Sequence, residues 1–194
     1  VLTIDRPEKA NALTSKMLNA LADFVEAAKH DEAVKVIALT GAGNVFSSGA
    51  DLGDVGQGLS TDPVWERLSG AIANSPVLTI AALNGTVAGG AMGMALACDL
   101  RIAVPGARFF YPVMKLGFLP QPSDPARLAA LVGPARAKLI LMAGQKITAQ
   151  EAYEFGLVDR IVDPDHLMQT ARDLVADSVN ADPEIAAGIA RLCS

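Results

Sequence analysis

The sequence contains only two cysteines and two histidines, and this scarcity excludes several kinds of site. Cys98 and Cys193 lie far apart, with no CxxC pair and no histidine near either, which favours buried or incidental thiols in a reducing compartment. His30 and His166 have no cluster of Asp, Glu or Cys at ligand spacing. We therefore expect neither a disulfide framework nor a metal site.

Positive charge and aromatic rings are also scarce. The 16 Lys and Arg residues are outnumbered by 21 Asp and Glu, which gives a net charge of −5. This balance excludes the basic patch of a nucleic-acid-binding protein and the Lys/Arg-rich face of a membrane-binding one. Aromatic residues make up 5% of a chain that is 51% hydrophobic, so we expect a core of Ala, Val, Leu and Ile. The length of 194 residues fits one domain, or one domain with a small appendage.

No signal-peptide pattern is seen, because Val1–Ile4 leads directly into the polar Asp5-Arg6, and we expect a cytoplasmic protein. One uncharged run, residues 68–98, is long enough to span a bilayer. Pro76 and the glycines at positions 85, 89, 90 and 93 interrupt it, and a lipid-exposed helix with such breaks would leave backbone groups unpaired. We interpret the run as a helix end, a buried strand, a glycine turn and a buried helix.

Hydrophobic periodicity predicts alternating strands and helices. The strands are expected over 1–4, 34–40, 77–83, 100–104 and 157–162, and the helices over 15–29, 63–75, 90–97, 125–132, 134–143, 148–155, 165–180 and 183–192. Thr14 is the expected N-cap of the first helix. Residues 112–125 are expected to form an irregular proline-rich loop. The alternation predicts parallel α/β packing followed by a helical end.

Two turns of small residues, 48–51 and 88–91, are the most informative feature of the chain. Each follows an apolar run and precedes a segment that can start a helix. The first turn of a helix has backbone N–H groups without internal partners, and the helix dipole adds positive charge there. Two such donors aimed at one point would form an oxyanion hole. A structural interpretation stays open for each turn: Gly89-Gly90 would allow close packing, and Asp51 would cap a helix.

Two other interpretations of glycine-rich segments are disfavoured. Gly41-Ala42-Gly43 follows a strand, but the third glycine of a dinucleotide-binding fingerprint would fall at Phe46. No Gly-Lys-Ser/Thr follows, which excludes a phosphate-binding loop of that type. No histidine lies near either small-residue turn, which disfavours a Ser-His-Asp hydrolase.

Four motifs follow one another along the chain. They are Arg6-Pro7 with Asn11-Ala12-Leu13, the segment Phe46 to Leu52, the segment Asn84-Gly85 to Asp99, and the segment Thr148 to Val158. Together they resemble the enoyl-CoA hydratase/isomerase family, also called the crotonase family, over nearly the whole chain. The resemblance implies an α/β fold with a spiral of ββα units over residues 1–133 and a C-terminal helical, oligomerisation-prone region of the same fold over 134–194. It also implies an acyl-CoA thioester substrate, no cofactor beyond the CoA moiety, and homotrimers or dimers of trimers.

The same resemblance assigns roles to residues of the two turns. The backbone N–H groups of Ala50 and Gly90 would hold the thioester oxygen. Negative charge develops on that oxygen during proton abstraction at the neighbouring carbon, and preorganised donors stabilise it. The segment Ser48 to Leu52 would line the adenine end of CoA. Lys9 is a candidate for binding the CoA phosphates, and an ordinary solvated lysine is the alternative.

The chain departs from the pattern of the hydratases, which use two glutamates as acid and base. By resemblance, the two glutamate positions are Gly93 and Val113, and neither side chain can transfer a proton. Asp124, in the proline-rich loop, is the leading replacement, because a carboxylate among Leu119 and several prolines would have a raised pKa. The alternative is that Asp124 caps the helix that starts at Pro125.

Three further side chains bear on the acid–base chemistry. Tyr111 and Glu66 are weaker candidates, and Arg127 is placed to neutralise Asp124 or to meet a substrate carboxylate. The missing glutamates favour isomerisation, or a lyase or hydrolase step, over hydration. A hydratase with a rearranged carboxylate and a non-catalytic acyl-CoA-binding protein stay open as alternatives. A purely structural subunit would leave both turns unexplained.

Overall fold

The computed structural model describes residues 1–193, whose strands form two sheets. The first sheet has the order β1-β2-β4-β6-β9, and all of its pairs are parallel. The second has the order β3-β5-β7-β8, with parallel pairs except for the antiparallel β7–β8 pair. The strands are β1 (Leu2–Ile4), β2 (Val36–Gly41), β3 (Val45–Ser47), β4 (Leu78–Leu83), β5 (Thr86–Ala88), β6 (Leu100–Ala103), β7 (Arg108–Phe110), β8 (Ile147–Thr148) and β9 (Arg160–Ile161).

Helices cover the strands and form the C-terminal end of the chain. The α-helices are α1 (Ser15–Ala28), α2 (Leu52–Val55), α3 (Val64–Ala73), α4 (Ala91–Ala97), α5 (Val113–Leu116), α6 (Asp124–Val132), α7 (Pro134–Leu141), α8 (Ala149–Phe155), α9 (Leu167–Leu174), α10 (Ala176–Asn180) and α11 (Pro183–Cys193). Short 3₁₀ helices are η1 (Pro7–Lys9), η2 (Leu59–Thr61) and η3 (Pro164–His166). Thr14 caps α1 as expected, since its hydroxyl accepts a hydrogen bond from the Met17 N–H.

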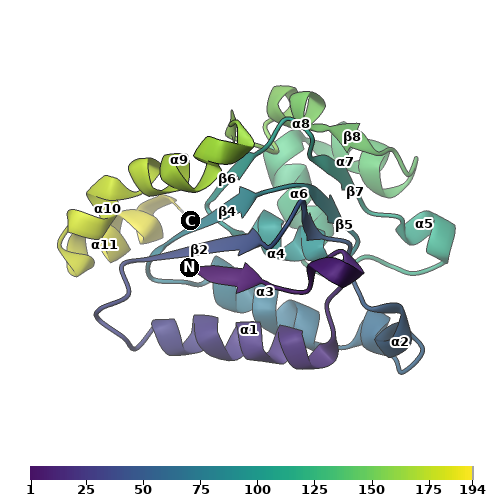
Figure 1. Cartoon of the computed structure of the whole chain (residues 1–194), viewed down its shortest axis with the longest axis horizontal. Helices are drawn as coiled ribbons and strands as arrows, with labels where there is room; N and C mark the ends of the chain where they lie inside the picture. The colour runs from purple at the N-terminus through teal and green to yellow at the C-terminus, as the bar shows by residue number, and fades with distance from the viewer. Residues whose placement is uncertain (194) are drawn as a thin grey trace.

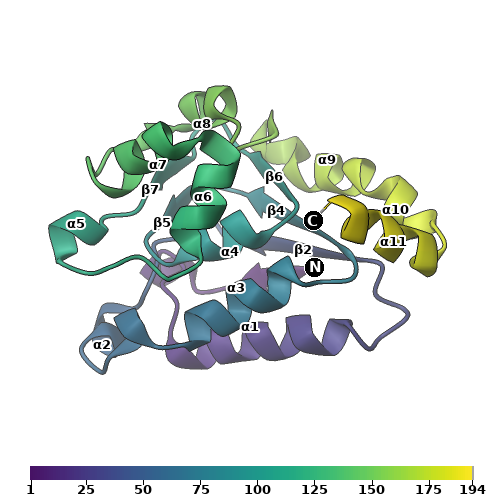
Figure 2. The same cartoon turned by 180° about the vertical axis from the view of Figure 1, so that it is seen from behind.

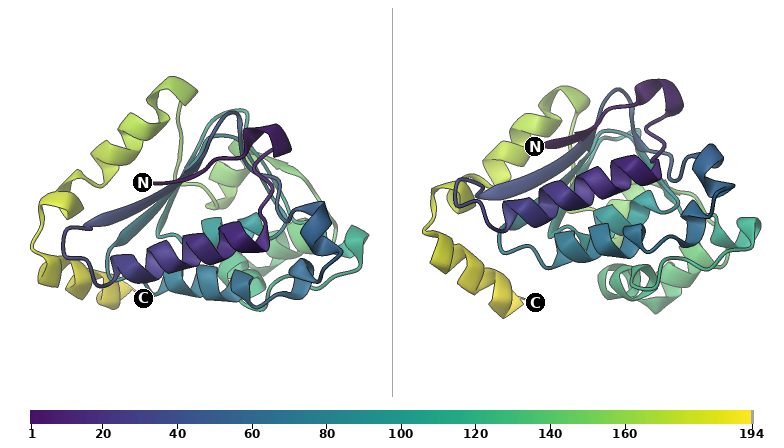
Figure 3. Two further views of the ribbon diagram at one scale, coloured as in Figure 1. Left: turned by 60° about the horizontal axis from the view of Figure 1, so that its bottom comes forward. Right: turned by 90° about the horizontal axis from the view of Figure 1, so that it is seen from below.

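Each turn of the chain adds one strand to each sheet and one helix to the layer beside them. The repeats are β2-β3-α3, β4-β5-α4 and β6-β7-α6. The helices α1, α3, α4 and α6 pack side by side in this order on the same side of the strands (Figure 2; Figure 3). This arrangement is the expected crotonase-type spiral of ββα units, followed by the expected C-terminal helices.

Two of the repeats contain an extra short helix, α2 after β3 and α5 after β7. Both extra helices lie at one end of the molecule, and α9 to α11 lie at the opposite end (Figure 1). The connections at the α2–α5 end therefore come from three successive repeats: the 48–51 turn from the first, the 88–91 turn from the second and the proline-rich loop from the third. This convergence brings the two small-residue turns and the proline-rich loop together.

Several sequence expectations need correction. The helix expected over 165–180 is divided into η3, α9 and α10, with a break at Val175, where φ is −104° and ψ is 5°. The strand expected over 157–162 is paired only at Arg160–Ile161. The loop expected over 112–125 contains α5, and α6 begins at Asp124. The hydrophobic pattern predicts none of the short strands of the second sheet, which only the resemblance to ββα units implies.

A buried arginine closes the end of α4. Arg101 is 4% exposed, and its guanidinium donates to the backbone carbonyls of Ala95, Cys98, Asp99 and Leu157. The positive charge lies at the C-terminal end of the helix, where the helix dipole favours it. The helix that begins at the second small-residue turn is thereby fixed at its other end.

No helix within residues 1–193 is both long and apolar enough to cross a membrane.

Candidate active site

The two small-residue turns follow neighbouring parallel strands, β3 and β5, and pack against each other. Gly49 and Gly89 have φ of +95° and +55°, in the left-handed region that glycine adopts at little cost. A Cβ placed on Gly49 would lie 2.9 Å from the carbonyl oxygen of Ala88 and 3.5 Å from the Cα of Gly89. The turns are therefore in contact through their backbones, and each precedes a helix, α2 or α4, as the sequence indicates.

The backbone hydrogen bonds on either side of Ala50 leave its own N–H without a protein acceptor within residues 1–193. The Leu13 N–H donates to the Gly49 carbonyl, and the Asp51 N–H donates to the Leu13 carbonyl, both at 2.8 Å. Ala50 is the central residue of this parallel bridge, so its own N–H points away from Leu13. In the second turn, the Gly89 N–H donates to Phe110, while Gly90 precedes the first residue of α4. Within residues 1–193, neither the Ala50 nor the Gly90 N–H donates to a protein acceptor.

Arg6 and Asp51 hold the first turn in place. Arg6 Nη1 donates to Asp51 Oδ2 at 2.6 Å and to the Ala12 carbonyl at 3.1 Å. The other Asp51 oxygen accepts from the Gly53 N–H at 2.9 Å and so caps α2. The hydrogen bond from Arg6 is the main cause that lowers the pKa of Asp51. Asp51 is thus a helix cap, as the structural interpretation proposed, and the Ala50 amide precedes it in the same turn.

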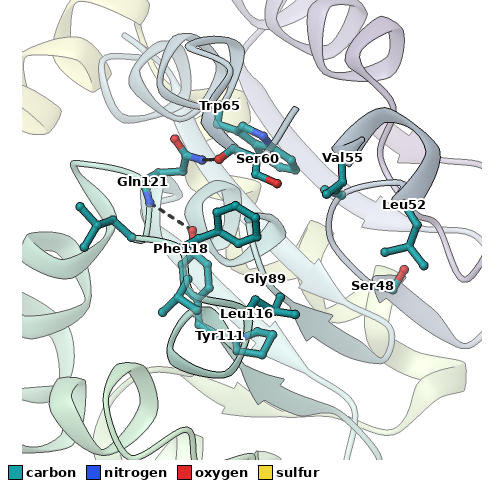
Figure 4. Close-up of a pocket in the computed structure, with 15 residues that line it drawn as sticks. Ser48, Leu52, Val55, Ser60, Trp65, Gly89, Tyr111, Leu116, Phe118 and Gln121 are labelled. Carbon is teal, nitrogen blue, oxygen red and sulfur yellow. Dashed lines mark hydrogen bonds between the residues drawn. The ribbon is translucent and has the colours of Figure 1, made fainter. Parts of the chain in front are cut away.

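Both turns open into one apolar pocket with a volume of about 210 Å³. Ser48, Ala50 and Leu52 line it from the first turn, and Gly89 and Gly90 line it from the second. Figure 4 shows Ser48, Leu52 and Val55 on one side and Trp65, Ser60 and Gln121 on the other. The remaining wall comes from the segment between β7 and α6: Tyr111, Pro112, Val113, Leu116, Phe118 and Leu119.

Trp65 forms part of this wall, and its only sequence signal is an apolar position on a predicted helix. Its indole N–H donates to the Leu59 carbonyl at 2.8 Å, and the residue is 4% exposed. A Cβ on Gly90 would lie 2.9 Å from the indole ring. Glycine at position 90 therefore leaves room for the ring as well as exposing an amide.

The predicted site residues are not all brought together. Ser48 and Leu52 are exposed at the rim of the pocket, Leu52 by 87%. Lys9, exposed on η1, is not among the lining residues. Val113, where the resemblance implies a hydratase glutamate, lines the pocket and is 7% exposed, and its side chain is apolar. Asp124 does not line the pocket.

Asp124 is 1% exposed and lies behind the pocket wall. One carboxylate oxygen accepts the Tyr111 hydroxyl proton at 2.9 Å. The other, Oδ1, forms a long ion pair of 4.0 Å with Arg127 Nη1, and neither atom has a hydrogen-bond partner within residues 1–193. No side chain caps α6, so the helix-cap interpretation of Asp124 is wrong. Glu66 accepts instead from the N–H and the hydroxyl of Ser123, at the residue before the helix.

Gly93 makes the position of this carboxylate possible. Gly93 is buried in α4, and a Cβ placed on it would lie 2.7 and 2.9 Å from the two Asp124 oxygens. Any side chain at position 93 would therefore displace the carboxylate. The carboxylate of Asp124, from one turn of the spiral, thus fills the space beside Gly93 in the preceding turn.

Burial raises the pKa of Asp124 to about 6. The Tyr111 hydrogen bond and the Arg127 charge act in the opposite direction, and the Glu66 charge adds to the rise. The carboxyl group thus changes its charge close to neutral pH, which is the range expected of a general acid or base.

We predict that this ionisation reduces stability as pH rises. Because the pKa is higher in the folded state, about 6 against 3.8, both states are protonated well below the unfolded value and Asp124 imposes no penalty there. Between pH 4 and 6 the unfolded state ionises first, and the penalty grows to about 3 kcal/mol above pH 6. Relative to Asp124→Asn, the wild type should lose about this much unfolding free energy between pH 4 and 7 in urea titrations. A difference that does not change with pH would contradict the assignment.

Comparisons with known proteins agree with this architecture. Residues 1–191 match the family model described as "Enoyl-CoA hydratase/isomerase". The chain is 36% identical over 193 residues to the short-chain-enoyl-CoA hydratase of Clostridium acetobutylicum, covering 94% of this chain and 72% of that protein. It is 32% identical over 182 residues to the 1,2-epoxyphenylacetyl-CoA isomerase of Escherichia coli, covering 89% and 70%. A crystal structure of an enoyl-CoA hydratase from Bacillus anthracis superposes with a TM-score of 0.92 at 30% identity, covering 97% of this chain and 76% of that one.

Proposed function

The chain belongs to the enoyl-CoA hydratase/isomerase family, and on this premise we propose that it is an acyl-CoA isomerase that works through an enolate. The observation that supports the proposal is that Ala50 and Gly90, whose N–H groups have no protein acceptor within residues 1–193, line the same apolar pocket. A thioester oxygen between them would accept from both. The negative charge that forms on this oxygen would then be stabilised by donors already in place.

The acid–base groups favour isomerisation over hydration. Hydration needs one group to activate water and another to protonate carbon, and both glutamate positions lack a proton-transferring side chain. Moving a double bond needs only one group, which removes a proton from one carbon and returns it to another. The Asp124 carboxyl, with a pKa near 6 and a hydrogen bond from the pocket residue Tyr111, supports proton transfer of this kind. Hydration with a rearranged carboxylate is the second candidate, since Asp124 fills the space beside Gly93.

The pocket also supports a neutral, apolar acyl group. No Lys or Arg is among its lining residues within 1–193, and its wall is dominated by Leu, Val, Trp and Phe side chains. We propose that Ser48 and Leu52, exposed at the rim, contact the adenine end of CoA, and that Lys9 binds its phosphates from outside the pocket. Relatives include proteins named as hydratases and as isomerases, so the reaction itself must be measured.

A panel of thioesters followed by mass spectrometry tests the proposal. We expect 3-hexenoyl-CoA to be converted to 2-hexenoyl-CoA, with unchanged mass and a different retention time. A product heavier by one water from 2-hexenoyl-CoA would favour the hydratase alternative. Saturable binding without turnover of any thioester would contradict the proposal and favour a binding protein.

A further inference from the structure

The Tyr111 hydroxyl connects the pocket to the buried carboxyl of Asp124. Tyr111 follows β7 and lines the pocket, with its side chain directed toward Gln121 (Figure 4). Its oxygen donates to Asp124 Oδ2 at 2.9 Å and accepts the Gln121 N–H at 3.3 Å. Gln121 is held in turn by a side-chain hydrogen bond to the Ser60 carbonyl at 3.0 Å. The hydroxyl is thus fixed from two sides.

Asp124 itself cannot meet a substrate in this arrangement, because it is 1% exposed and absent from the pocket lining. Tyr111 can. A phenol oxygen has one proton to donate and two sites that accept. The proton goes to Asp124 and one accepting site to Gln121, which leaves one site for a proton from the pocket.

We propose that Tyr111 is the catalytic residue that exchanges protons with the substrate, and that Asp124 is a positioning residue that takes up the tyrosine's own proton. This inference rests on the proposed isomerase function. The C–H bond next to the thioester breaks, its electron pair forms the enolate, and the proton bonds to the Tyr111 oxygen. At the same time the former phenol proton moves to Asp124 Oδ2. In the return step the phenol protonates the γ-carbon and Asp124 returns its proton to Tyr111, so no other reactant is consumed.

The surrounding charges agree with this coupled transfer. Burial and the negative charge of Asp124 raise the pKa of Tyr111, so the phenol keeps its proton unless the carboxylate accepts it. The charged groups around Asp124 are Arg127, at 4.0 Å, and Glu66, which is held by Ser123. Neither gives Asp124 a hydrogen bond within residues 1–193. Tyr111 is therefore its proton partner in this part of the chain.

Two variants test the inference. Tyr111→Phe should lower kcat for 3-hexenoyl-CoA by about 10²- to 10⁴-fold, because the proton-transfer group is gone, while binding of unreactive hexanoyl-CoA stays near the wild-type value. Asp124→Asn keeps an acceptor for the phenol but cannot take up a proton, and should lower kcat comparably. Melting temperatures and circular dichroism show whether each variant is folded.

A fluorine label at position 111 gives a pH-dependent ¹⁹F signal that would not follow the kinetics if Tyr111 had only a structural role. The chain has only two tyrosines, and Tyr153 lies half exposed on α8. Growth on 3-fluorotyrosine in a Tyr153→Phe background therefore labels position 111 alone. We expect its ¹⁹F resonance to titrate near pH 6, at the same midpoint as the rise of kcat with pH. Both midpoints should disappear in Asp124→Asn, and a label at Tyr153 in Tyr111→Phe should show no such step.

Failure of the proposed isomerase function and failure of the role of Tyr111 give different results. A wild type that converts no enoyl-CoA overturns the proposed function. A wild type that converts 3-hexenoyl-CoA, with a folded Tyr111→Phe that retains its kcat, overturns the role of Tyr111 and leaves the isomerase intact. A ¹⁹F midpoint that differs from the kinetic midpoint likewise overturns the coupling of Tyr111 to Asp124.

Discussion

Replacing Gly90 by glycolic acid, which exchanges one backbone N–H for an ester oxygen, should lower kcat by about 10²- to 10³-fold. The amide has no protein acceptor within residues 1–193, so its loss removes no hydrogen bond of the fold. Its only expected partner is the oxygen that becomes negative in the transition state. Replacing Ala50 by lactic acid should have an effect of the same size. Steady-state kinetics on 3-hexenoyl-CoA measure both.

A side-chain substitution at Gly90 is a poorer test, because a Cβ there would meet the Trp65 ring at 2.9 Å and disturb folding as well. The ester avoids this clash. Gly106, exposed between β6 and β7, offers a matched control: glycolic acid at that position should leave kcat unchanged. Equal losses at Gly90 and Gly106, or a loss of melting temperature that parallels the loss of kcat, would contradict the catalytic role of the Gly90 amide.

Gly85→Ala should reduce the free energy of unfolding by about 3 kcal/mol or more. Gly85 joins β4 to β5, and a Cβ there would lie 2.0 Å from the Asn44 carbonyl oxygen and 2.9 Å from the Val45 Cα. Asn44 lies in the connection from β2 to β3, and Val45 is the first residue of β3. Because both contacts are with backbone atoms, they cannot move aside as a flexible side chain would. The β2–β3 and β4–β5 connections, which belong to neighbouring turns of the spiral, would have to separate. Urea unfolding measures the effect.

Gly106→Ala is the control for this prediction as well. Nothing lies within 4 Å of a Cβ at Gly106, and its φ is not positive. Its substitution should change stability by no more than about 1 kcal/mol, with a small gain expected from the less flexible unfolded chain. Similar losses at Gly85 and Gly106 would contradict the close backbone approach.

The features that could be predicted from sequence are those that local chemistry determines. Thr14 caps α1 because a hydroxyl before an apolar helix satisfies its free N–H groups. The turns at Gly49 and Gly89 could be recognised because glycine after an apolar strand marks a special backbone. The second sheet could not, because its strands are two or three residues long, too short for an alternating pattern to be read.

Asp124 shows where such reasoning ends. Its proline-rich surroundings suggested a raised pKa, and Pro125 suggested a helix start, which α6 confirms within one residue. That its side chain turns to Tyr111, and that Gly93 leaves space for it, follows from the packing of successive turns of the spiral. No spacing in the sequence expresses that contact. The glycine at position 93, where the resemblance implies a hydratase glutamate, leaves room for the side chain of Asp124, which lies far along the chain.

The central claim is that the amides of Ala50 and Gly90 bind one carbonyl oxygen, and a crystal structure with hexanoyl-CoA tests it most directly. The account predicts a thioester oxygen about 2.7–3.1 Å from both amide nitrogens, with the acyl chain in the pocket beside Tyr111. A thioester oxygen that contacts only one of these amides, or neither, would contradict it.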